Sequence, residues 1–385
     1  MKKKMHYIAA IILVLLMISF TYGFIAGAFR YPPYYSLKSY YKQFVVREYD
    51  KYELIDPLYL ETNVSSLISI GNRNDVIQKR NGLVRYIWKT QGFPHTEMPG
   101  GIEEDIQDNR YSNLNNLESV DKITVSMDYG LKSIIYHFRP IKSNDKLIVY
   151  HEGHDGDFIL GKKTIEFFLD KGYSVMAFSM PLLGINNNPV ADLKSFGKVN
   201  LTSHNYFYFL DSNNFSSIKF FVEPIAISLN YIEKNFDYSS ISMIGISGGG
   251  WTTTLYSAID PRISRSYSVA GSLPTYLRKF GEVGDYEESL PELYNIANYL
   301  ELYILSSYGN NRKHLQVLNK FDSCCFAGIS YKTYEKEVES AMSNLGNGSF
   351  KIYLDDTHKE HKISDNALDI IISDLEQGSW NDFKK

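Results

Sequence analysis

The sequence predicts an α/β fold, a mostly parallel β-sheet with helices on both faces. Two observations support this prediction. From Lys122 onward, short apolar runs rich in Val and Ile alternate with segments of helical spacing. In residues 239–260, a strand-like run leads through a glycine-rich turn directly into a helix-like segment. The chain has 385 residues, 44% of them hydrophobic, which is enough to bury a large core.

The expected elements begin with three strands in succession and then alternate. Strands are expected at 122–130, 131–140, 145–153, 174–181, 239–247, 263–271, 299–307 and 349–356. Helices are expected at 162–173, 217–236, 248–260, 334–342 and 364–378, and Pro224 should start or kink the second of them. A few antiparallel strands followed by such alternation are typical of a largely parallel sheet covered on both faces.

The chain divides into three parts by composition. Residues 1–29 form an N-terminal apolar segment, and residues 120–385 form the α/β domain. Residues 30–119 are polar, rich in Tyr and Asn, and partly helical in pattern at 36–55 and 74–92. We interpret them as a juxtamembrane stalk or an N-terminal extension that packs on the main domain. Residues 274–298 interrupt the alternation with Pro, Gly and acidic residues, and we expect a small lid there.

The N-terminus carries a targeting signal. Lys2, Lys3 and Lys4 precede an uncharged run from Tyr7 to Phe29. As a helix, this run would be about 34 Å long at about 1.5 Å per residue, enough to cross a bilayer. The lysines favour a cytoplasmic N-terminus, with the rest of the chain outside the cytoplasm. The alternative is a cleaved signal peptide and a secreted protein, because 26–28 (Ala-Gly-Ala) fits a cleavage site.

Charge and cysteine content exclude several classes of protein. The formal net charge of −4 gives no basic surface, so no nucleic-acid partner is expected. The only cysteines, Cys324 and Cys325, are adjacent. A disulfide between neighbours is strained, so we expect neither a disulfide framework nor a zinc site, and we place the pair in a core. No dinucleotide or Walker motif is present, so no cofactor and no metal are expected.

The glycine-rich turn reads Gly245-Ile246-Ser247-Gly248-Gly249, a G-x-S-x-G pattern. Alone the pattern is weak, but here it ends a strand and opens a helix, as in a nucleophile elbow. The elbow needs small residues two before and two after the serine, because strand and helix approach closely there. Ser247 is therefore the candidate nucleophile, and the amide of Gly248 is a candidate oxyanion donor. The alternative is a glycine-rich connection without chemistry.

A second motif, His151-Glu152-Gly153-His154, follows the expected strand at 145–153. Gly153 can turn the backbone, and the amide of His154 can supply a second oxyanion donor. A metal site made by His151, Glu152 and His154 is the alternative, but on an extended segment these side chains do not share one face. A plain turn is the third interpretation.

The base is sought near the C-terminus, because a serine hydroxyl needs a neighbouring base to become a nucleophile. His361 stands three residues before Ser364, a candidate N-cap of the last helix. We favour His361 as the base, with His358 as the alternative. Two surface histidines without a role are the remaining interpretation.

The candidate acid is Asp322, which lies between the last two expected strands and precedes an apolar segment. Asp355 and Asp356, at the end of the last expected strand, are the alternatives. Such an acid fixes the imidazole tautomer and stabilises the imidazolium as it forms.

From about Lys122 to the C-terminus, the chain resembles the α/β-hydrolase superfamily of serine esterases. The resemblance rests on the order of four pieces: HEGH after a strand, GISGGG, DPRISRSYSVAG after the elbow helix, and HKIS before the last helix. It implies Ser247 as nucleophile, His361 as base, Asp322 as acid, and the Gly248 and His154 amides as oxyanion hole. Asp322 lies some way from the expected strand end, and residues 1–119 have no counterpart in the family's core.

The resemblance implies a serine hydrolase that cleaves a carboxylic ester through an acyl-enzyme, and the N-terminal segment predicts that it is anchored in a membrane. Its partner would be an ester-bearing small molecule or a polysaccharide of the envelope or the cell exterior. A peptidase or an acyltransferase would use the same triad. An inactive hydrolase-like interaction protein is the alternative from a different class.

Overall fold

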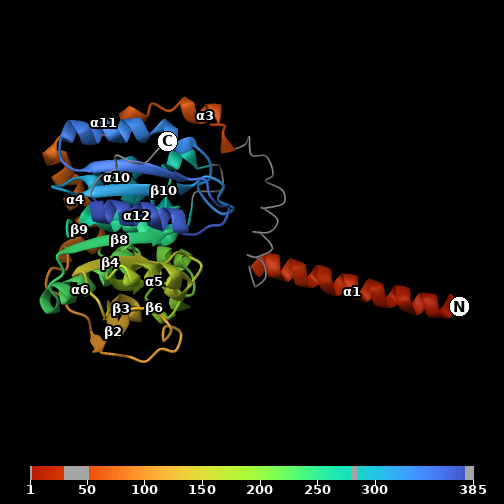
Figure 1. Ribbon diagram of the computed structural model, residues 1–385. Helices are drawn as coiled ribbons and strands as arrows, with labels where there is room; N and C mark the ends of the chain where they lie inside the picture. The colour runs from red at the N-terminus through yellow and green to blue at the C-terminus, as the bar shows by residue number, and fades with distance from the viewer. Residues whose placement is uncertain (1, 30–51, 279–283, 378–385) are drawn as a thin grey trace. The chain divides into compact units, whose positions relative to one another are not determined.

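The computed structural model describes residues 2–29, 52–278 and 284–377 (Figure 1). The chain forms two compact units, residues 1–53 and 54–385. Residues 54–119 thus belong to the same unit as the α/β domain. Of the segment 36–55, for which partial helix is predicted, all but the last four residues lie outside the described residues.

In the first unit, α1 (Lys2–Phe29) is a single helix, and its large apolar side chains between Ile11 and Ile25 are exposed. In the part of the chain that the structure describes, no helix has the length and apolar character that crossing a membrane requires. The prediction of a transmembrane helix is therefore not supported.

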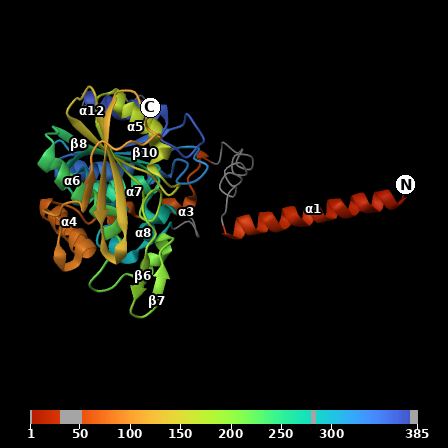
Figure 2. The same ribbon diagram turned by 90° about the horizontal axis from the view of Figure 1, so that it is seen from below.

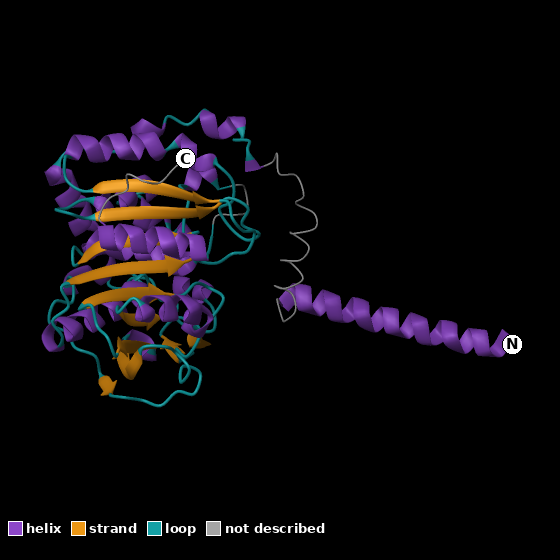
Figure 3. Cartoon of the chain, in the orientation of Figure 1, coloured by secondary structure: helices purple, strands orange, loops and turns teal. Residues whose placement is uncertain are grey.

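The second unit is built on a nine-stranded sheet in the order β1-β2-β3-β5-β4-β8-β9-β10-β11 (Figure 3). In the sheet order, the strands β5-β4-β8-β9-β10-β11 are parallel, whereas β1, β2 and β3 are antiparallel to their neighbours. The sheet strands are β1 (Gly101–Glu103), β2 (Leu117–Ser126), β3 (Lys132–Pro140), β4 (Lys146–His151), β5 (Ser174–Phe178), β8 (Ser240–Ile246), β9 (Ile263–Val269), β10 (Lys313–Asn319) and β11 (Ser349–Asp355). A separate hairpin contains β6 (Val190–Leu193) and β7 (Gly197–Asn200).

Helices cover both faces of the sheet (Figure 2). One face carries α5 (Lys162–Asp170) and α12 (Asp365–Gln377). The other face carries α4 (Arg73–Trp88), α6 (Lys219–Asn235), α7 (Gly248–Ile259), α10 (Tyr299–Ser307) and α11 (Glu335–Leu345). Three shorter helices are α3 (Pro57–Leu60), α8 (Tyr286–Ser289) and α9 (Pro291–Tyr294).

The strands join these two layers because their side chains alternate between the faces. In β4, Leu147 and Val149 belong to the apolar cluster under α6, α7 and α10, whereas Ile148 and Tyr150 belong to the cluster under α5 and α12. Strands buried on both faces read as continuous apolar runs, which is the pattern that the sequence shows. The predicted mostly parallel α/β fold is confirmed.

Most predicted elements form, but one predicted strand is a helix and one strand was missed. The strand predicted at 299–307 is wrong, because these residues form α10. All nine side chains of α10 are buried, so the helix has no exposed polar face and the run shows no helical period. Its start is marked by a capping box, in which Asn298 accepts from the Leu300 and Glu301 amides. The true strand, β10, was not predicted. Pro224 lies inside α6 rather than at its start.

The carboxyl ends of the parallel strands meet at one edge of the sheet, where α7 approaches very closely. A Cβ atom on Gly249 would lie 2.1 Å from the carbonyl oxygen of His151, and one on Gly245 would lie 2.1 Å from the carbonyl oxygen of Gly249. No side chain fits between these backbones. The glycines at both positions are therefore required for β4, β8 and α7 to pack together.

We expect Gly249→Ala to destabilise the fold by about 3 kcal/mol or more, because the added methyl group must separate α7 from β4. The measurement is the free energy of unfolding in urea. Gly71→Ala is the matched control, since a Cβ there would meet only Asp75 at an ordinary 3.7 Å. Equal stability of the two variants would contradict the close approach.

Candidate active site

Ser247 occupies the turn between β8 and α7 with a φ of +55°. This left-handed conformation is unusual for a residue other than glycine and marks strain that the surrounding structure maintains. The Ser247 carbonyl accepts the first helical hydrogen bond from the Trp251 amide at 2.9 Å. Gly248 is the first residue of α7, so its amide has no acceptor within the helix. The turn has the geometry of a nucleophile elbow.

The loop after β4 lies directly against this serine. A Cβ atom on Gly153 would lie 2.7 Å from the Cβ of Ser247, so only glycine fits there. The Gly153 amide donates to the Glu152 carboxylate at 2.9 Å, and the Tyr150 hydroxyl donates to the same carboxylate at 2.5 Å. Because the Gly153 amide is already engaged, it cannot serve as an oxyanion donor. The next amide along the loop is that of His154.

The side chain of His154 packs on the elbow. Its ring atoms Cε1 and Nδ1 lie 2.4 and 2.6 Å from the position of a Cβ on Gly248. Its Nε2 lies 2.7 Å from Oε1 of Glu287, a residue with no exposed surface in α8. Burial alone would lower the pKa of His154, but the charge of Glu287 and the hydrogen bond to it raise this pKa to about 9.

His151 and Glu152 point elsewhere, so the three residues weighed as a metal site do not gather their donor atoms. His151 is buried, its ring stacks on Phe178, and its Nδ1 lies 2.9 Å from the Glu152 carbonyl oxygen. Burial lowers the pKa of His151 to about 4 and raises that of Glu152. Both residues stabilise the loop through buried contacts with its backbone and with β4.

His361 and Asp322 are paired: Nδ1 of His361 lies 2.7 Å from Oδ2 of Asp322. Asp322 is buried three residues after the end of β10. The unpredicted strand β10 thus removes the apparent gap between the acid and its strand. Asn319 also donates to the carboxylate, from Nδ2 at 3.3 Å.

The other nitrogen of His361, Nε2, is buried and has no hydrogen-bond partner among the described residues. A buried nitrogen without a partner is costly, and it is available to a hydroxyl or a substrate. Burial would lower the pKa of His361, but the hydrogen bond and charge of Asp322, with the charges of Asp155 and Glu152, raise it above its ordinary value. The 152–155 loop that touches Ser247 therefore also lies within electrostatic reach of His361.

The alternative residues have other partners. Asp355 accepts hydrogen bonds from Thr357 and from the Ser364 hydroxyl, and His358 Nε2 lies 3.4 Å from it. Asp356 is exposed. Ser364 is the N-cap of α12, since its Oγ accepts from the Ala367 amide at 2.9 Å. His358 and Asp355 therefore form a separate pair under the start of α12.

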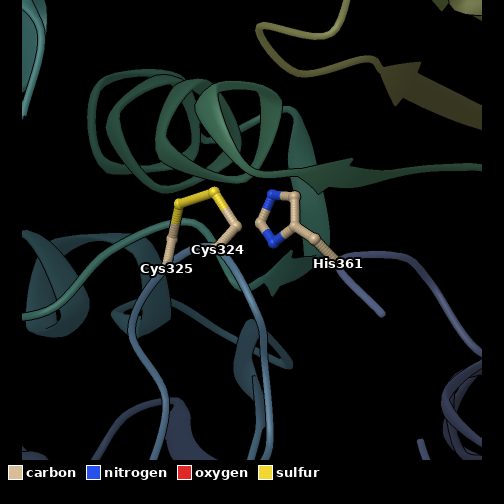
Figure 4. Close-up of side chains that lie close together, drawn as sticks. All are labelled: Cys324, Cys325 and His361. Carbon is tan, nitrogen blue, oxygen red and sulfur yellow. A yellow bond between two sulfur atoms is a disulfide. The ribbon is translucent and has the colours of Figure 1, made fainter. Parts of the chain in front are cut away.

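Cys324 and Cys325 form a disulfide, so the expectation of an unbonded pair in a core is wrong. Cys324 is exposed, and the disulfide lies beside the imidazole of His361, with its sulfur atoms and a ring nitrogen within 4.8 Å of one another (Figure 4). The amides of both cysteines donate to Oδ1 of Asp322, at 2.7 and 3.1 Å. This tight turn around the carboxylate brings the two sulfur atoms together. The disulfide thereby rigidifies two of the donors that hold the acid.

Comparison with solved structures identifies the fold. An acetyl xylan esterase from Thermoanaerobacterium matches with a TM-score of 0.52 and 13% identity, over 83% of this chain and 97% of its own. One from Paenibacillus matches with a TM-score of 0.52 and 12% identity, over 84% and 99%. The methylesterase BT1017 matches with a TM-score of 0.51 and 15% identity, over 80% and 66%. No protein-family model and no curated protein matches the sequence.

These matches and the strand order define the α/β-hydrolase fold, in agreement with the resemblance noted in the sequence. At such low identity they establish the fold alone. Within it, the structure brings Ser247, Gly248 and the 153–154 loop together, and it pairs His361 with Asp322. Glu287 could not be predicted as a partner of His154, because 133 residues separate them and no motif surrounds Glu287.

We expect Asp322→Asn to lower the pKa of His361, because the substitution removes the carboxylate charge that stabilises the imidazolium. In the variant, the neutral, proton-accepting form of His361 would become the major form at a lower pH than in the wild type. The measurement is an NMR titration of the imidazole resonances. Asp356→Asn is the control and should leave this pKa in place. A larger effect from Asp356→Asn would assign the charge partner differently.

Proposed function

We propose that this protein is a serine hydrolase that cleaves carboxylic esters through Ser247, His361 and Asp322. The observation that carries the proposal is a strained serine at a strand–helix elbow together with a buried histidine. Its Nδ1 is bound to an aspartate, and its Nε2 has no hydrogen-bond partner in the part of the chain that the structure describes. The fold supports the same conclusion, because it presents an elbow serine at the carboxyl edge of the sheet.

In the proposed reaction, His361 Nε2 takes the proton of the Ser247 hydroxyl as the oxygen attacks the ester carbonyl. Asp322 holds the tautomer that leaves Nε2 free and stabilises the imidazolium as it forms. The carbonyl oxygen becomes an oxyanion, and the amides of Gly248 and His154 are its proposed donors. Each such donor lowers the barrier by about 3 kcal/mol in well-studied hydrolases.

His361 then returns the proton to the departing alkoxide, which leaves an acyl group on Ser247. A water molecule attacks the acyl-enzyme with the same histidine as base, releasing the carboxylic acid and restoring the hydroxyl. The Gly153 amide already donates to Glu152, so the amide of His154 is the proposed second oxyanion donor. The proposal therefore assigns Gly153 only the role of bringing the loop against the serine.

We further propose a short acyl ester on a polysaccharide as the substrate class. Two solved structures with the same fold are acetyl xylan esterases by name, and their overall likeness to this chain supports testing acetyl esters first. The discriminating measurement compares p-nitrophenyl acetate, butyrate and octanoate, and the release of acetate from acetylated polysaccharide. A strong preference for octanoate would contradict a short acyl group.

We expect a fluorophosphonate probe to label the wild-type protein and to leave Ser247→Ala unlabelled, because the probe reacts only with an activated serine. Hydrolysis of p-nitrophenyl acetate should fall by about 10⁴-fold or more in Ser247→Ala and His361→Ala. His358→Ala is the matched control and should retain turnover, since His358 pairs with Asp355. Equal labelling of wild type and Ser247→Ala would refute the proposal. Turnover that survives His361→Ala would assign the base to another residue.

We also propose that the Leu54–Lys385 unit functions outside the cytoplasm. The proposal rests on the three N-terminal lysines followed by an apolar run, and on the Cys324–Cys325 disulfide, since disulfides persist mainly in oxidising compartments.

The test is fractionation of expressing cells, followed by N-terminal sequencing of the mature protein. We expect the protein in the extracytoplasmic or medium fraction. A new N-terminus after Ala28 would identify a cleaved signal, and an intact Met1 in a membrane fraction would identify an anchor. Recovery in the cytoplasm alone would overturn the proposal.

A further inference from the structure

Four polar side chains gather beside the elbow, and we call them the His154 cluster: His154, His204, Asp285 and Glu287. His154 Nε2 lies 2.7 Å from Glu287 Oε1 and 3.3 Å from Asp285 Oδ2. His204 Nδ1 lies 3.2 Å from each oxygen of Glu287. The residues come from three separate segments of the chain: the loop after β4, the 3-10 helix His204–Phe209, and α8 with the residue before it.

The tautomer of His204 is fixed by a backbone contact. Its Nε2 lies 2.8 Å from the carbonyl oxygen of Pro181, an acceptor only, so Nε2 carries a proton. Nδ1 faces the carboxylate of Glu287, an acceptor, so in the absence of an ion it donates a proton there, and a bound cation would replace that proton. Histidines that bind metals are oriented in this way, by donation of the other ring N–H to a backbone carbonyl.

The side chain of Asp285 contacts His154 and does not cap its own helix. It occupies the N-cap position of α8, where an aspartate commonly accepts hydrogen bonds from the first helical amides. Its side chain makes no such capping bond and lies instead at His154. Its contact with His154 accounts for this orientation and places a second carboxylate oxygen beside the same ring nitrogen.

Charge and burial also favour a divalent cation. Glu287 has no exposed surface and His204 is 6% exposed, so this half of the cluster lies out of water, whereas His154 and Asp285 border the solvent. Two carboxylates and one divalent cation give a neutral group, which is the inexpensive form for a buried site. Two imidazole nitrogens favour zinc over calcium or magnesium, which prefer oxygen ligands throughout.

We propose that His154, His204, Asp285 and Glu287 bind a structural zinc ion. A tetrahedral zinc ion with bonds of about 2.0–2.1 Å holds its ligand atoms about 3.3 Å apart. The separation of 3.2 Å from His204 to Glu287 matches this spacing, and the donor atoms of His154, His204 and Glu287 all lie within 4.8 Å of one another. Asp285 Oδ2 lies 3.3 Å from His154 but outside that group, so it would move toward the other ligands to complete the site. The 2.7 Å pair of His154 and Glu287 must open by about 0.6 Å as zinc replaces the proton between them.

The bound ion would connect the loop after β4, which carries His154, to α8 and to the 3-10 helix His204–Phe209. Glu287 and Asp285 belong to the 274–298 segment, and the ring of His154 packs on Gly248. Zinc would therefore hold α8, His204–Phe209 and the loop after β4 in one arrangement around the elbow. The metal takes no part in the proposed ester cleavage, so its presence can be tested without any substrate.

The experiment measures zinc content and thermal stability of the full chain. The protein is stripped with dipicolinic acid, incubated with zinc chloride, dialysed and assayed by mass spectrometry for bound metal. We expect one zinc ion per chain, and a rise in Tm of about 5 °C at a zinc concentration a hundredfold above the Kd. Calcium and magnesium should give neither effect. Cobalt should give the visible absorption of a four-coordinate site.

The variants Asp285→Asn and His154→Gln each remove one proposed zinc ligand. Both side chains are at least one-quarter exposed, so the variants should fold. Each should weaken zinc binding at least about tenfold. Asp155→Asn, which removes an adjacent exposed carboxylate outside the cluster, is the control and should bind zinc as the wild type does. No reductant is present, because reduced Cys324 and Cys325 beside His361 would offer a second set of zinc ligands.

Two results would overturn the proposal. One is a wild-type protein that retains no zinc after dialysis and shows no change in Tm, which would leave the cluster as a metal-free network of ion pairs. The other is zinc binding that is equally strong in wild type, Asp285→Asn and His154→Gln, which would place the metal elsewhere on the chain. Neither result bears on the labelling of Ser247.

Discussion

The contact of three backbones at Gly249 is the constraint on which the candidate site depends. The first turn of α7 lies against the ends of β8 and β4, with no room for a Cβ at Gly245 or Gly249. This packing holds Ser247 at a positive φ and brings Gly153 against it. A strained residue persists only where its surroundings over-determine its conformation. The positions of the serine, of the first-turn amide of Gly248 and of the loop after β4 are therefore consequences of the same close approach.

The proposed acid–base pair, Asp322 and His361, is organised by hydrogen bonds rather than by packing. One oxygen of Asp322 accepts from two consecutive amides, and the other faces His361 and Asn319. The carboxylate is buried, so these donors replace water and keep the charged form favourable. The disulfide between Cys324 and Cys325 closes the turn that supplies the two amides. Because Nδ1 of His361 is committed to Asp322, the buried Nε2 is the one nitrogen of this ring left for chemistry.

The two halves of the site meet in the loop after β4. This loop contacts Ser247 through Gly153 and contacts Glu287 of α8 through His154. The charges of Glu152 and Asp155, in the same loop, raise the pKa of His361. The lower side of the loop is anchored by Tyr150 and by the Glu152 amide, which donates to Phe178. A rigid loop of this kind couples the position of α8 to the proposed oxyanion donors. The His154 cluster is the point at which that coupling can be strengthened or lost.

The sequence by itself determined the α/β class, the elbow and the residues that form it. These features are local: the alternation of elements, and a serine flanked by glycines at a strand end, are visible within a few residues. It also pointed to Asp322 and His361, since chain order and a nearby N-cap restrict their positions. It failed at 299–307, where a helix buried on all sides has no polar face to reveal its period. Only the tertiary structure decided the register of β10, the disulfide beside His361 and the gathering of His154, His204, Asp285 and Glu287. Those contacts join residues far apart in the chain, and only the packing of separate segments around the sheet edge brings them together.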